Sequence, residues 1–184
     1  MSRLSGHKPV EANLSVVYNQ DRYFYICGWD DPGSLSDERE GRTMVNLLVG
    51  HKGSGKTKQM IDLANERADT AAGSLIFINK NHRLMYDLKH TIRVVCMEDF
   101  PGITNSDEYI GFIYGIISSD HDIEAMFIDS ILKHTDVSLE DLPVFIERLK
   151  KIAEHHEIEF IVSLSAEKEE MVGVDFSGCD ILNQ

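Results

Sequence analysis

The sequence lacks a surplus of basic residues and any long apolar run. Its 184 residues include 18 Lys and Arg against 31 Asp and Glu, which gives a formal net charge of −13. Proteins that neutralise nucleic-acid phosphates normally carry the opposite balance, so the composition argues against nucleic-acid binding. No apolar stretch approaches the roughly 20 residues that span a bilayer, and residues 1–9 lack the apolar core of a signal peptide. We therefore expect a cytoplasmic protein with no membrane partner.

Cysteine is also scarce. Cys27, Cys96 and Cys179 are odd in number and far apart, which favours a reducing compartment over a disulfide framework. There is no C-x-x-C pair to suggest zinc. His155 and His156 are adjacent, but neighbouring helix residues point about 100° apart, so we interpret them as a solvated helix end.

The chain changes character near Met44. Residues 1–43 carry scattered Gly and Pro, and their apolar runs Leu14–Tyr18 and Tyr23–Cys27 are compatible with a small hairpin. We expect 1–43 to be a weakly ordered N-terminal extension and 44–184 to be the folded domain. The segment just before Met44 back-translates to a purine-rich run, so two hypotheses stand equally: a translated leader that is not native, or a genuine extension.

From Met44 onward, short apolar runs alternate with helical periodicity. Helices are predicted after Gly55, from Ser106, and from near Asp141, where Pro143 falls in the first turn. This alternation predicts an α/β fold of three layers, α/β/α, around a mostly parallel sheet. The predicted strands are Val45–Val49, Leu75–Ile78, Ile92–Met97, Ala125–Ile128 and Phe160–Leu164.

The most informative motif lies between the first predicted strand and the first predicted helix. It matches G-x-x-x-x-G-K-[ST] and consists of Gly50, His51, Lys52, Gly53, Ser54, Gly55, Lys56 and Thr57. Such a loop turns backbone N–H groups toward phosphate oxygens, its lysine reaches the β- and γ-phosphates, and its Thr hydroxyl binds Mg²⁺. The following helix directs its N-terminus at the phosphates. The motif predicts a P-loop that binds ATP and Mg²⁺, and therefore that 44–184 is a nucleotide-binding domain.

A P-loop protein also needs a carboxylate that holds Mg²⁺ through water, normally at the end of a neighbouring apolar strand. Asp129 follows Ala125–Ile128 and meets this requirement. We therefore predict Thr57 and Asp129 as the Mg²⁺ residues, and Lys56 and Asp129 as the catalytic ones. His51 and Lys52 either touch the nucleotide or point to solvent.

From Met44 to about residue 170 the sequence resembles the RecA-like branch of P-loop ATPases. Ile128-Asp129-Ser130 resembles the end of their Walker B strand, and Phe160–Ser165 resembles their sensor strand, with Ser163 or Ser165 as its polar residue. The core also resembles small stand-alone ATP-binding proteins that are sometimes labelled as twitching-motility (pilus-retraction) ATPases. The resemblance implies a RecA-like fold and Mg·ATP as the ligand.

The departures from that family concern the catalytic base. Residues 75–82 resemble the second strand of RecA-type recombinases, which ends in a catalytic glutamate just before a histidine, but Asn81 stands in the place of that glutamate. Ser130 rather than glutamate follows Asp129. Glu98 and Asp99 are possible substitutes, although a solvated acidic strand end explains them better. We expect binding of a nucleoside triphosphate and slow hydrolysis.

Three functions remain open. The first is a slow ATPase or nucleotide-dependent switch, which acts alone, as a homo-oligomer or on an unidentified protein partner. The second is a small nucleotide or metabolite kinase, although residues 154–184 lack the arginines of a phosphate-covering lid. The third is a non-hydrolysing ATP-binding interaction module. Hexameric relatives complete their sites with a neighbour's arginine, and the candidates here are Arg67, Arg83, Arg93 and Arg148.

Overall fold

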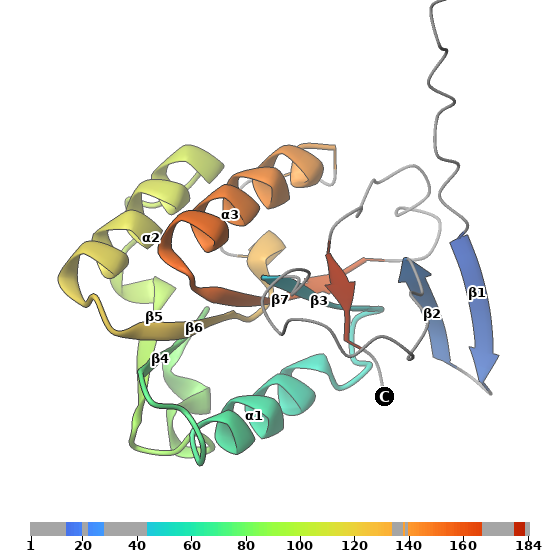
Figure 1. The fold of residues 1–184 in the computed structure, drawn as a ribbon. Coiled ribbons are helices and arrows are strands. Elements are labelled where there is room, and N and C mark those ends of the chain that lie inside the picture. The colour runs from blue at the N-terminus through green and yellow to red at the C-terminus, as the bar shows by residue number, and fades with distance from the viewer. Residues whose placement is uncertain are drawn as a thin grey trace, which may run out of the picture.

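The computed structural model describes residues 14–19, 22–27, 44–133, 138, 140–166 and 179–182, with the backbone alone for the first two ranges and for residues 133, 180 and 181. Its centre is a parallel sheet whose strands lie in the order β5-β4-β6-β7-β3-β8 (Figure 1). The strands are β3 (Val45–Gly50), β4 (Ser74–Asn79), β5 (Ile92–Cys96), β6 (Ile123–Ile128), β7 (Glu159–Ser165) and β8 (Asp180–Ile181).

Five of these strands coincide with predicted apolar runs, which confirms the α/β class and the parallel pairing. β3 to β7 are apolar because most of their side chains are buried between helices on both faces of the sheet. β8 was not predicted, since two residues at a sheet edge leave no periodic signal.

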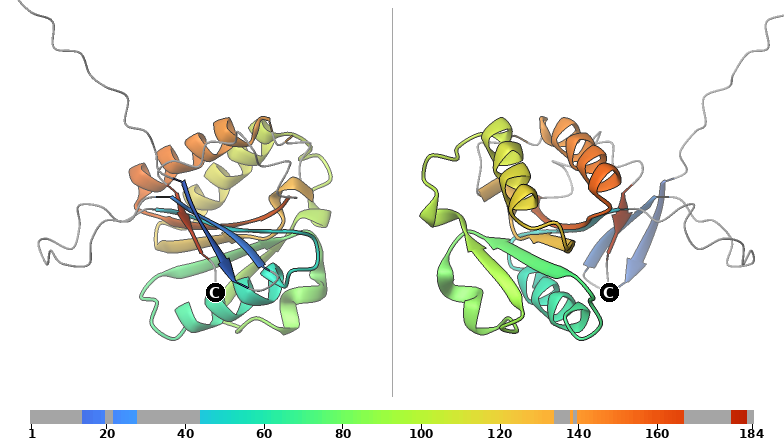
Figure 2. Two further views of the ribbon diagram at one scale, coloured as in Figure 1. Left: turned by 90° about the vertical axis from the view of Figure 1, so that its right-hand side faces the viewer. Right: turned by 60° about the vertical axis from the view of Figure 1, so that its left-hand side comes forward.

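Helices cover both faces of the sheet (Figure 2). The buried side chains of α1 (Lys56–Arg67) pack with Leu75 and Phe77 on one face. Those of α2 (Ser106–Ser119) and α3 (Leu142–His156) pack with Ile76 and Ile78 on the other. Successive residues of β4 therefore alternate between the two layers, as strand geometry requires.

The predicted helix starts are confirmed. In α2 the Asn105 side chain accepts the Glu108 N–H at 3.0 Å, and the Glu108 carboxylate accepts the Asn105 N–H at 3.3 Å, a reciprocal capping box. In α3 the N-cap is Asp141, and Pro143 lies within the first turn, where its missing N–H breaks no helical hydrogen bond.

The chain before Met44 contributes β1 (Leu14–Asn19) and β2 (Arg22–Cys27), which pair as an antiparallel hairpin separate from the main sheet. Other residues of the predicted 1–43 extension lie outside the described ranges, so its weak order stays a prediction. Among the described residues, no helix combines the length and apolar character needed to cross a membrane.

Candidate functional site

The predicted P-loop connects β3 to α1 at the carboxyl edge of the sheet. Gly53 and Gly55 have φ angles of 87° and 89°, a left-handed conformation that glycine adopts without a Cβ clash. Gly55 is the N-cap of α1, and no side chain caps that helix end. Because the first N–H groups of any α-helix have no acceptor within the helix, the start of α1 offers donors suited to an anion.

Lys56 is the only lysine of the loop that is buried. Its side chain folds back so that Nζ donates to the carbonyl oxygens of Gly50 and His51 at 2.7 and 2.8 Å, with Ser54 Oγ at 3.3 Å. Lys56 is 7% exposed, whereas His51 and Lys52 are exposed and their side chains lie at the solvent side of the loop. The cation is thus held by carbonyl oxygens of the loop itself.

Thr57 and Asp129 meet although 72 residues separate them. Thr57 Oγ1 lies 3.1 and 3.2 Å from the two carboxylate oxygens of Asp129. Asp129 is buried, and its backbone N–H donates to the Ile78 carbonyl at 2.9 Å, which extends the β4–β6 pairing by one residue. The fold therefore brings together the two residues predicted to bind Mg²⁺.

Ser163 fixes the Asp129 carboxylate from the neighbouring strand. Its hydroxyl donates to Asp129 Oδ1 at 2.7 Å and accepts the Ser130 N–H at 2.6 Å. Ser130 has a φ of 58°, so the chain turns sharply straight after Asp129. Of the two serines considered for the sensor strand, Ser163 is the one that contacts the candidate site.

Asn79 is a polar residue of this site that the sequence patterns did not reveal. Ile78 pairs with Ile128 in the sheet, so Asn79 lies one strand away from Asp129, at the same level and on the α1 face. It is 1% exposed, and neither atom of its side-chain amide has a hydrogen-bond partner in the described structure. Buried amides nearly always have hydrogen-bond partners. The unpaired Asn79 amide therefore indicates a position where a polar group of a ligand can form a hydrogen bond.

The alternative catalytic acids lie farther away. Glu98 and Asp99 follow β5, which is four strand spacings, about 19 Å, from the P-loop strand β3. Both side chains are exposed, and Asp99 pairs with His82 at 3.1 Å. A carboxylate at the end of β5 is therefore too far from the predicted P-loop to act as a base on a phosphate bound there.

Other residues considered from the sequence have local roles. The Asn81 side chain accepts the Arg83 N–H at 3.2 Å and caps the short helix η1 (His82–Tyr86). Arg67 bridges Glu124 and Glu159 at 3.0 Å each. Arg148 pairs with Asp107, whereas Arg83 and Arg93 are exposed.

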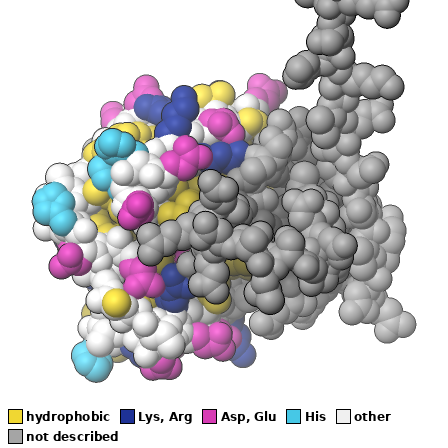
Figure 3. Space-filling model, in the orientation of Figure 1, with side chains coloured by type: hydrophobic (Ala, Val, Ile, Leu, Met, Phe, Trp, Pro, Cys, Tyr) yellow, Lys and Arg dark blue, Asp and Glu magenta, His cyan; other side chains and the backbone are white. Residues whose placement is uncertain are grey.

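The charges on the described surface agree with the composition. Figure 3 shows acidic side chains spread over one face, with lysines and arginines interspersed among them rather than gathered in a stripe. A comparison of the sequence with models of known protein families finds no match, and neither does a comparison with curated protein sequences. The geometry of the site therefore carries the functional argument.

Proposed function

We propose that this chain binds Mg·ATP at the loop Gly50–Thr57 and acts as a slow ATPase or nucleotide-dependent switch. The observation that carries the proposal is the convergence of the loop lysine, Thr57 and Asp129 at one end of the sheet. A glycine-rich turn without this function would have no need for a buried carboxylate, that of Asp129, hydrogen-bonded to the hydroxyl of Thr57.

The residues present fit a triphosphate. The Lys56 ammonium has three donors and a flexible stem, so it can exchange the Gly50 and His51 carbonyls for phosphate oxygens. The backbone N–H groups at the start of α1 supply further donors and a partial positive charge. In a chain of net charge −13, this loop provides a local positive site for an anion.

The donor set next to the loop fits Mg²⁺. This ion prefers oxygen ligands and keeps several waters, and Thr57 and Asp129 supply one hydroxyl and one carboxylate. Bound there, Mg²⁺ would neutralise charge on the phosphate oxygens. Ser163 holds the carboxylate in place, so Asp129 is oriented before ligand arrives.

The RecA-like assignment belongs to this proposal. It is supported by the position of β7 between β3 and β6, which lets the sensor-like Ser163 reach the carboxylate of the Walker B-like strand.

Hydrolysis is expected to be slow because neither of the two positions at which the resemblance places a catalytic glutamate holds a carboxylate. Ser130 follows Asp129, and Asn81 is an amide whose oxygen already caps η1. Without a positioned base, turnover loses a contribution of about 10²–10⁴-fold.

Calorimetric titration of Mg·ATP into the wild type, Lys56→Ala and Lys58→Ala tests the proposal. Lys58 is exposed and lies two positions along the chain from Lys56, which makes it a matched control. We expect Lys56→Ala to weaken binding by about 10–100-fold, the value of one or two charge-assisted hydrogen bonds, and Lys58→Ala to bind like the wild type.

Equal binding by all three proteins, or no binding by the wild type, would refute the nucleotide site. ATP turnover measured on the same samples, with and without small-molecule acceptors, separates the functions. Slow phosphate release indicates the ATPase or switch, acceptor-dependent ADP formation indicates a kinase, and binding without turnover indicates an interaction module.

A further inference from the structure

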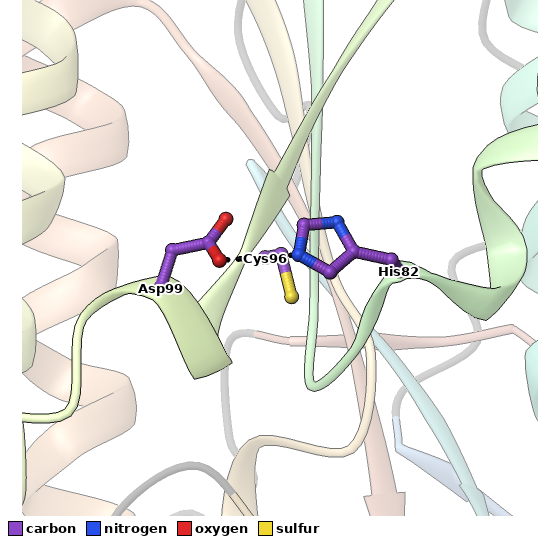
Figure 4. A group of neighbouring side chains, drawn as sticks. All are labelled: His82, Cys96 and Asp99. Carbon is purple, nitrogen blue, oxygen red and sulfur yellow. Dashed lines mark hydrogen bonds and ion pairs between the residues drawn. The ribbon is translucent and has the colours of Figure 1, made fainter.

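A second group of side chains lies at the same edge of the sheet, away from the P-loop. His82, Cys96 and Asp99 place an imidazole nitrogen, a thiol sulfur and a carboxylate oxygen within 4.8 Å of one another (Figure 4). Among the described residues this is the only such group of metal-ligand types. We propose that these three residues bind a zinc ion.

Local structure aligns the three ligands. Cys96 is the N-cap of the short 3-10 helix η2 (Met97–Asp99), and side chains three residues apart in such a helix lie on the same side. Cys96 and Asp99 therefore face one direction. His82 begins η1 after β4, which pairs with β5, and its Nε2 lies 3.1 Å from Asp99 Oδ1.

The backbone beneath the group is also fixed. The Lys80 carbonyl accepts the Cys96 thiol at 3.4 Å and the Glu98 N–H at 3.1 Å, which ties the end of β4 to the end of β5. Only the ends of the side chains need to move to reach a common ion. Zinc binds nitrogen, sulfur and oxygen at about 2.0–2.3 Å, so shifts of less than about 1 Å suffice.

The ligand types favour zinc over Mg²⁺. A thiolate is a soft ligand, and together with imidazole and carboxylate it suits a tetrahedral zinc site. Cys96 is buried, whereas His82 and Asp99 are 59% and 54% exposed, so water can occupy the fourth position. Binding releases the Cys96 proton to solvent and breaks the hydrogen bond to the Lys80 carbonyl, with no redox change.

This site is independent of the proposed nucleotide site. β5 lies two strand spacings, about 10 Å, from β6 and Asp129. Two ions that act on one phosphate group lie about 3.5–4 Å apart, so the zinc ion would not form a two-metal centre with Mg²⁺. It would instead join η1 to η2 and fix the far edge of the sheet.

Cobalt(II) titration of the full-length protein tests the site, because thiolate coordination gives a charge-transfer absorption that oxygen and nitrogen ligands do not give. We expect this absorption to saturate at one equivalent and to disappear when zinc is added. The absorption should be absent in Cys96→Ser. His82→Gln and Asp99→Asn should each bind cobalt(II) about tenfold or more weakly than the wild type.

Because the His82 and Asp99 side chains are exposed, their substitution should not impair folding. Circular dichroism of every variant checks that it is folded. Cys179→Ser and Cys27→Ser test the other thiols, and His155→Ala/His156→Ala tests the exposed histidine pair; all should keep the absorption. No thiolate absorption in the wild type would overturn the proposal, as would its survival in Cys96→Ser or unchanged affinity in both His82→Gln and Asp99→Asn.

Discussion

Asn79 is the residue whose environment is hardest to explain without a ligand. Its amide is fully buried beside Asp129, and it has no hydrogen-bond partner in the described structure. Such a group costs about 1–3 kcal/mol of stability when unpaired. In the proposed nucleotide site, the amide would be satisfied by a polar group that arrives with the ligand.

We predict that Asn79→Leu stabilises the free protein by about 1–2 kcal/mol, because an apolar side chain of similar size removes the unpaired amide. The same variant should bind Mg·ATP more weakly or turn it over more slowly, a trade of function for stability. Urea denaturation and calorimetry measure the two effects.

Asn46 supplies the control. It is also a buried strand asparagine, but its amide donates to Glu159 at 2.8 Å. Asn46→Leu should therefore destabilise the protein. If Asn79→Leu lost as much stability as Asn46→Leu, the Asn79 amide would have a partner after all, and its assignment to the site would fail.

At the scale of the element, the loop Gly50–Thr57 depends on the backbone conformations of Gly53 and Gly55 rather than on packing. A Cβ at Gly55 would meet no atom within 4 Å, yet its φ of 89° is strained for any L side chain. The sequence therefore uses glycine there for its conformation.

We predict that Gly55→Ala destabilises the protein by about 1–2 kcal/mol and impairs nucleotide binding by distorting the loop. Gly111 lies within α2, where an added Cβ also meets nothing within 4 Å. Gly111→Ala should stabilise the protein by about 0.5–1 kcal/mol, since alanine favours a helix. Thermal denaturation measures the change in stability of each variant. A change of the same sign in both variants would contradict this explanation.

The sheet as an element explains which site residues the sequence could reveal. Asp129 was found because it ends an apolar run next to a recognisable loop motif. Asn79 also ends such a run, but which strand lies beside it depends on the strand order, and β7 inserts between β3 and β6 without a local signal. His82 and Cys96 approach only because β4 pairs with β5, so their spacing along the chain could not indicate a shared site.

For the whole molecule, a charged brace ties α1 to the amino-terminal edge of the sheet. Arg67 bridges Glu124 and Glu159, and Glu124 also accepts the N–H groups of Ala72 and Gly73 at 3.0 and 3.2 Å. Burial raises the pKa of Glu124, but these hydrogen bonds and Arg67 outweigh it, so the pKa lies below the ordinary value. Ionised Glu124 therefore stabilises the folded chain.

Because the folded pKa is lowered, this stabilisation is complete above the unfolded pKa and is lost as the pH falls through the folded pKa. We predict that Glu124→Gln lowers the free energy of unfolding by about 1 kcal/mol at neutral pH, a modest value because the side chain is 30% exposed. The difference should vanish in acid. Denaturation of the wild type and of Glu124→Gln between neutral and acidic pH measures this difference in unfolding free energy. Glu147→Gln, at an exposed position, is the control. A difference that does not depend on pH would contradict the stabilising role of ionised Glu124.

The net charge of −13 also limits the possible partners of the molecule. Of this charge, −11 lies from Met44 onward, where 13 basic residues face 24 acidic ones. An acidic domain repels long polyanions but can still hold one small anion where a loop lysine and helix N–H groups converge. The charge and the loop are therefore compatible with a nucleotide ligand and argue against a nucleic acid.

The most direct test of the central proposal is a crystal structure with Mg²⁺ and a non-hydrolysable ATP analogue. We predict that the triphosphate lies within Gly50–Thr57, that Lys56 Nζ leaves the Gly50 and His51 carbonyls for the β- and γ-phosphates, and that Mg²⁺ lies by Thr57 and Asp129. At saturating analogue, a nucleotide bound elsewhere, or a loop with Lys56 still on those two carbonyls, would contradict the account.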